Sequence, residues 1–164
     1  MNSRTYFNEI IRNIKHHGSV ADFRIKGKTL YRQYRDAVQL INFQGSQSNT
    51  ADVLKFTVNL GIYLQPLAIL DEDPETTTNI LKAHWSRRIG SYKDDGIDYW
   101  WTVQSESQVQ SVSYEVIQIL EQSAIPAMNG LSSTAALCAI WKRGDHPGIY
   151  ERQRQRFLEL LCGE

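Results

Sequence analysis

The sequence predicts an α+β fold: an antiparallel sheet of about five strands with an N-terminal helix and C-terminal helices packed on it. Apolar residues recur with a helical period before residue 18 and after residue 104, and they alternate with a strand period between these limits. The length of 164 residues suits a single domain, 1–164. A hydrophobic fraction of 41% and a charged fraction of 22% are typical of globular proteins with a packed core.

The first element is expected to be a helix that stops before Gly18. Its apolar residues follow the spacing of one helical stripe: Phe7, Ile10, Ile11 and Ile14. Ser3 is the expected N-cap, because its hydroxyl can accept a hydrogen bond from the first turn. Residues 15–17 are basic and suit the negative end of the helix dipole.

A run of strands is expected from residue 29. Residues 29–34 and 38–44 have strand-like composition, and Arg35 and Asp36 between them predict a hairpin. The segment LKFTVNLGIYL at 54–64 gives the clearest strand, because its apolar residues alternate without a break. Polar residues fill most of the other positions, so we expect one buried and one polar face.

Two more strands, at 84–92 and 97–104, are expected on either side of Asp95-Gly96, which is a strong hairpin signal. In the register that this turn sets, Gly90 faces Trp101. Trp100 then falls on the core face, and Trp101 falls on the other face with Tyr99, Arg88 and His84, where it can form part of a binding platform. In the alternative, helices cover both faces and both tryptophans are core. A slip of one residue exchanges the two faces.

The C-terminal third is expected to be helical. One helix is marked by Val109, Val112, Val116 and Ile119, with Pro126 beyond its end. Residues 132–142 predict a short helix capped by Ser132 or Ser133, with Cys138 packed rather than reactive. Residues 149–161 predict the last helix, whose arginines lie on a solvated face. Its inward residues are expected to be Tyr150, Phe157, Leu160 and Leu161.

Polar residues on three predicted strands can form one hydrogen-bonding patch. His84, Ser86 and Arg88 alternate on one strand, Lys55, Thr57, Asn59 and Tyr63 on another, and Asn42 and Gln44 on a third. An arginine beside aromatic rings can hold a carboxylate or a phosphate, and His84 is the one candidate base. The alternative is a solvated sheet face without a site. The candidate binding residues are Gln44, Asn59, His84, Arg88, Tyr99 and Trp101.

Several function classes find no support in the sequence. It contains no phosphate-binding loop, dinucleotide motif, nucleophile elbow or zinc-protease motif, so no cofactor is expected. The four histidines and two cysteines lack metal-site spacing, so no metal is expected. The chain has 18 basic and 18 acidic residues, which argues against nucleic-acid binding. It shows no signal segment and no membrane-spanning run, which favours the cytoplasm.

Short motifs in a fixed order (NFQ, NLG, RIG and WW) lie within longer segments: TLYRQYRDAVQLINFQGS, FTVNLGIYL, RRIGSY followed by DYWW, and SAIPAMNGLSS. In these segments the sequence resembles the bacterial domain-of-unknown-function 4304 family, from the first helix to about Trp141. The resemblance implies a cytoplasmic α+β domain without an established activity, and it supplies no catalytic residues. The matching motifs contain Asn42, Gln44, Asn59, Arg88, Trp100 and Trp101.

The leading hypothesis is a non-catalytic module that binds a protein partner through the polar sheet face, with a toxin-neutralising immunity protein as one version. The competing hypothesis is a small-ligand site, or an enzyme, that holds an anionic group with Arg88 and uses His84 as base. A third hypothesis is self-association into a homo-oligomer through the same face. A closed pocket beside His84 favours the second hypothesis, and a flat patch favours the first.

Overall fold

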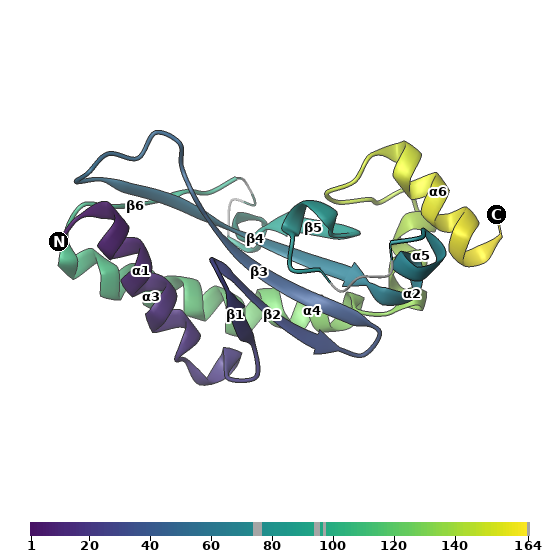
Figure 1. The fold of residues 1–164 in the computed structure, drawn as a ribbon, viewed down its shortest axis with the longest axis horizontal. Coiled ribbons are helices and arrows are strands. Elements are labelled where there is room, and N and C mark those ends of the chain that lie inside the picture. The colour runs from purple at the N-terminus through teal and green to yellow at the C-terminus, as the bar shows by residue number, and fades with distance from the viewer. Residues whose placement is uncertain (74–76, 94–95, 97, 164) are drawn as a thin grey trace.

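A computed structural model describes residues 1–73, 77–93, 96 and 98–163. Within these residues, six strands form one antiparallel sheet, as the sequence predicts (Figure 1). The strands are β1 (Arg24–Lys26), β2 (Thr29–Tyr34), β3 (Ala37–Gly45), β4 (Leu54–Leu64), β5 (Trp85–Arg88) and β6 (Trp101–Val103). Strands β1 to β4 pair in chain order, and both β5 and β6 pair with the far edge of β4.

Helices cover one face of the sheet and one of its ends. Figure 1 shows three of them beneath the sheet: α1 (Ser3–Lys15), α3 (Glu106–Ile119) and α4 (Ile125–Leu131). Three others gather where β4 ends: α2 (Gln65–Leu70), α5 (Thr134–Lys142) and α6 (Glu151–Cys162). Short 3-10 turns are η1 (Gly18–Val20), η2 (Ile80–Lys82) and η3 (Ile89–Tyr92), and the π-helical turn η4 (Leu120–Ala124) joins α3 to α4.

The central meander has the predicted limits. Strand β4 spans 54–64 and β2 spans 29–34, while β3 is one residue longer at each end than the predicted 38–44. Arg35 has a positive φ of 54° in the turn between β2 and β3. The three-residue strand β1 was not predicted, because all of its side chains are exposed and no apolar alternation marks it.

The predicted hairpin between β5 and β6 is wrong. Residues 85–88 pair with 59–62 of β4, and residues 101–103 pair with 54–56 of the same strand. Gly90 lies in η3 and not opposite Trp101, and Asp95 of the expected turn lies outside the described residues. Since β4 is eleven residues long, its free edge can satisfy the backbone groups of both short strands.

The main core lies between the sheet and the helices beneath it. The apolar stripe of α1, the even-numbered side chains of β4 and the inner faces of α3 and α4 form one buried cluster. A smaller cluster lies on the opposite face of the sheet, around Leu40 and Tyr63, with Ile80 packed against it. Thr57 and Gly61 on that face are also buried, so the face expected to be polar is partly covered.

Helix boundaries differ from expectation at two points. Asn2 and not Ser3 caps α1, because its side chain accepts a hydrogen bond from the Thr5 N–H. Pro126 lies beyond the end of α3, as expected, but the chain continues through η4 and places this proline in the first turn of α4, where no backbone N–H is needed. Tyr150 is 80% exposed because it precedes α6 as the N-cap.

Two predictions for the C-terminal helices are confirmed. Ser133 caps α5 by accepting a hydrogen bond from the Ala136 N–H. Cys138 is buried, with its Sγ 3.4 Å from the Sγ of Cys162. Arg152 and Arg156 of α6 are exposed, as expected, whereas Arg154 is half-buried, pairs with Glu151 and donates to the Trp141 carbonyl.

Candidate functional site

A row of polar side chains crosses the face of the sheet opposite α1 and α3. The row follows the strand register: Thr29 of β2 pairs with Asn42 of β3, Asn42 pairs with Asn59 of β4, and Asn59 pairs with Arg88 of β5. Paired residues share a face of the sheet. The Asn42 Nδ2 donates to Thr29 Oγ1 at 3.0 Å, and the Asn59 Nδ2 donates to Asn42 Oδ1 at 3.0 Å. Asn59 also donates to Gln44 Oε1 at 2.8 Å. The row therefore holds its amides in fixed orientations.

Arg88, at the end of this row, is held by residues that precede β6. Its guanidinium donates to Asp98 Oδ1 at 3.0 Å and lies 5.1 Å from the ring centroid of Trp100. The Trp100 Nε1 donates to the other Asp98 oxygen at 3.3 Å. All three side chains remain in contact with solvent, and the Asp98 side chain is 58% exposed. A cation, an aromatic ring and a carboxylate therefore form one surface triad.

A cavity of about 380 Å³ lies beside the triad. Polar groups of Gln44, Asn59 and Arg88 line one part of it, and Ile80, Leu81 and Ala83 line another. Leu81 is 89% exposed at the edge of the cavity. The cavity therefore combines hydrogen-bonding groups, two arginines (Arg87 and Arg88) and an exposed apolar edge.

Two glycines allow the covering segments to approach the sheet. A Cβ on Gly61 would lie 2.6 Å from Ile80 Cδ1 and 3.1 Å from Ala83 Cβ, so η2 and Ala83 approach β4 closely where this position has no side chain. Gly148 has a φ of +80°, and a Cβ there would lie 2.0 Å from Ser86 Oγ. The Ser86 N–H also donates to the Pro147 carbonyl at 3.3 Å. Both segments that cover this part of the sheet therefore come closest to it at a glycine.

Trp101, expected on the binding platform, is a core residue. It is 2% exposed, pairs with Phe56 in register and stacks on that ring at 5.5 Å. Because Phe56 points toward α1, its register partner points the same way. Tyr99 packs edge-on against Trp101, and Lys93 lies 4.1 Å over the Tyr99 ring. The position expected for Trp101 beside Arg88 is taken by Trp100.

His84 does not serve as a base in the cavity. It is 6% exposed and does not line the cavity, and its Nδ1 accepts the Leu64 N–H at 2.8 Å. Its ring stacks on Tyr63 and meets Phe157 edge-on. Burial lowers the pKa of His84 to about 4, against the opposing effect of Asp71 and Asp73. The imidazole is therefore a neutral structural acceptor at pH 7.

Three of the six predicted residues line the cavity together: Gln44, Asn59 and Arg88. Sequence reasoning missed Trp100, Leu81 and Gly148. The adjacent tryptophans did signal Trp100, but the wrong pairing exchanged their faces. Leu81 and Gly148 lie in segments without apolar periodicity, so no pattern marked them.

Other chemistry is limited in the described part of the chain. None of the residues described there forms a group of three or more histidine, cysteine, aspartate or glutamate side chains suited to a metal ion. Among the described helices, none combines the length and apolarity that crossing a bilayer requires.

Comparison with known proteins finds one relationship. The model of a family described as a domain of unknown function, DUF4304, matches residues 20–130, which is more than half of the chain. No curated protein and no solved structure matches the chain. The matched region contains the polar row, the triad and all the cavity-lining residues except Gly148.

Proposed function

The chain belongs to the DUF4304 family, and for this member we propose a non-catalytic function: it binds a partner protein through the cavity and the triad, in the cytoplasm of a bacterial cell. An immunity protein that covers a toxin is one version of this function. The partner presents a carboxylate to Arg88 and an apolar side chain to Leu81 and Trp100. The family description names no activity, so the proposal depends on the chemistry of the site.

The triad is the observation that carries this proposal. Arginine and tryptophan are the side chains that most often dominate protein interfaces, and here they contact each other at the edge of a cavity. The carboxylate that pairs with Arg88 belongs to an exposed residue, so a carboxylate of the partner can replace Asp98 or join it. Leu81 adds exposed apolar area beside this charge.

The lining of the cavity favours binding over catalysis. Among its described lining residues, none carries an imidazole, a thiol or a carboxylate. Amides, arginines and an aliphatic edge can orient and hold a ligand, whereas proton transfer needs a group that titrates near the working pH.

Photo-crosslinking in the native cell tests the proposal. A photoreactive amino acid at position 81 should crosslink one protein, and Arg88→Glu should abolish that product. The matched control places the same probe at Tyr114. This residue is 65% exposed and belongs to α3, which covers the opposite face of the sheet from the cavity. A second control, Arg152→Glu on α6, changes charge by the same amount. Equal crosslinking with and without Arg88→Glu would contradict the proposal.

A small anionic ligand is the second candidate, because a cavity of about 380 Å³ falls within the range of small-molecule sites. Thermal unfolding against a panel of nucleotides, sugars and metabolites tests it. A ligand at a hundred times its dissociation constant stabilises the fold by about 2.7 kcal/mol. A shift that Arg88→Ala removes would support this candidate over a protein partner, and a panel without shifts would exclude its members.

Concentration-dependent sedimentation would reveal a homo-oligomer as the partner instead.

A further inference from the structure

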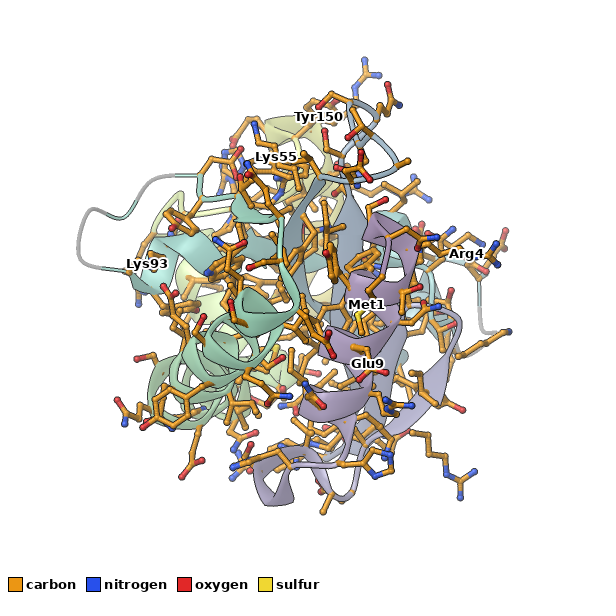
Figure 2. All side chains as sticks on the ribbon, turned by 90° about the vertical axis from the view of Figure 1, so that its left-hand side faces the viewer. Met1, Arg4, Glu9, Lys55, Lys93 and Tyr150 are labelled. Atoms are coloured by element: carbon orange, nitrogen blue, oxygen red, sulfur yellow. The ribbon has the colours of Figure 1, made fainter. Side chains whose placement is uncertain are left out.

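A second concave surface runs between α1 and the turn that joins β1 to β2. It consists of two adjoining hollows of about 530 and 320 Å³, which share Asn8 and Lys28. The larger continues to the loop after β3, and the smaller continues toward Ile25 of β1. We call this surface the α1 groove. Figure 2 shows Arg4 of the groove projecting from one flank, while Tyr150 and Lys55 lie at the top of the molecule.

The α1 groove concentrates positive charge in a chain with no net charge. Four basic side chains line it: Arg4, Arg12, Lys15 and Lys28. Its described lining contains no aspartate or glutamate, although the whole chain has equal numbers of basic and acidic residues. Arg12 forms an ion pair with Glu9. In the described part of the chain, no ion pair is seen for Arg4, Lys15 or Lys28. The lining of the groove therefore carries a net positive charge.

The geometry of α1 spaces these charges along the groove. Arg4, Asn8 and Arg12 are four residues apart and lie on one face of the helix, which separates neighbours by about 6 Å along its axis. Lys28 lies across from them, with its Nζ 4.7 Å above the buried ring of Phe7. The two arginines, with Asn8 between them, are therefore about 12 Å apart along the axis. Carboxylates four residues apart on an extended chain are about 13 Å apart, which is close to this spacing.

The apolar residues of the groove favour a peptide over a nucleic acid. Ile25 is 46% exposed at one end of the groove, where it can contact an aliphatic side chain. The described lining contains no tryptophan or tyrosine, its Phe7 is 4% exposed and covered by Lys28, and His16 supplies a single exposed ring. Single-stranded nucleic acids need exposed rings on which bases can stack. We propose that the α1 groove binds an extended acidic peptide segment of a partner protein, independently of the triad.

Fluorescence anisotropy with a defined probe tests this proposal. The probe is a labelled octapeptide in which glutamate alternates with serine and one central serine is replaced by leucine. We expect saturable binding that weakens at least tenfold in Lys28→Glu and in Arg4→Glu, both of which change exposed side chains. Binding should weaken as salt rises, because the contact is electrostatic.

Matched variants and probes separate the outcomes. Arg88→Glu and Arg152→Glu change charge by the same amount outside the groove and should bind the octapeptide like the unmodified protein. A loss in Arg88→Glu alone would assign the peptide to the triad and overturn the groove. Equal binding of a peptide with glutamine in place of glutamate would also overturn it. An octathymidylate that binds more tightly than the peptide, and is lost in Lys28→Glu, would replace the peptide with a nucleic acid.

Discussion

The two faces of the sheet are closed in different ways. The lower face is covered by α1, α3 and α4, whose apolar stripes continue the alternation of β4 (Figure 1). In the described residues, the upper face is covered by short segments, including η2, α2 and the loop around Gly148, and it retains a cavity with polar groups. The comparison teaches that long periodic elements complete a core, while short irregular covers leave room for recognition.

The largest expected effect on the free energy of unfolding belongs to Trp101, the buried member of the adjacent tryptophans. We expect Trp101→Ala to lower the free energy of unfolding by about 3–5 kcal/mol, because it removes a fully packed ring from the lower face. Urea denaturation measures this loss, and Trp101→Phe should recover part of it. A loss below about 1 kcal/mol would show that the lower face is not the main core.

The pH dependence of stability tests whether His84 is buried in the upper face. Below pH 6.5 the unfolded chain binds a proton that the folded chain, with its pKa near 4, does not bind. Stability from His84 is therefore complete above pH 6.5 and falls by about 3 kcal/mol as the pH drops to 4. Urea denaturation at several pH values should show this loss in the unmodified protein relative to His84→Gln. Parallel pH profiles would mean that the imidazole is accessible to protons in the fold.

Gly148→Ala tests the cover of the cavity. The new Cβ collides with Ser86, and we expect a loss of about 1–3 kcal/mol from overpacking together with the strain of a positive φ. Gly144→Ala is the matched control, because Gly144 has a φ of +87° but no atom near the position of a Cβ. The difference in thermal stability between the two variants gives the cost of the collision with Ser86, because both share the strain of a positive φ. Equal losses would mean that the loop does not press against β5.

The smallest expected effect on stability belongs to Trp100→Ala. Trp100 is only partly buried, so the loss should be below about 1 kcal/mol. The same variant should remove the crosslink from position 81, because Trp100 positions Arg88 and contributes apolar area. A stable variant that still crosslinks would separate Trp100 from the binding surface.

Much of the fold could be predicted because its central strands carry complete local patterns. The alternation at 54–64 and the stripe of Phe7, Ile10, Ile11 and Ile14 predict elements that the structure contains. The partners of β5 and β6 could not be predicted, because pairing with β4 is a non-local choice. A local hairpin signal at Asp95-Gly96 favoured a different partner.

The site was predicted in part for the same reason. Gln44, Asn59 and Arg88 follow from alternation along strands whose faces were correctly assigned. Trp100 and Trp101 were exchanged because the pairing partner of β6 decides which of them points to the core. The burial of His84 depends on Tyr63 and Phe157, which come from distant segments and leave no pattern beside the histidine.

The long free edge of β4 also has a consequence during folding. In the described part of the chain, its second row of backbone groups is paired by residues 84–88 and 101–103, which follow it in the sequence. Until both segments dock, eleven residues with alternating apolar side chains present an open strand to other chains. Variants that delay the docking of β5 or β6 should therefore aggregate during expression even when their folded state is stable.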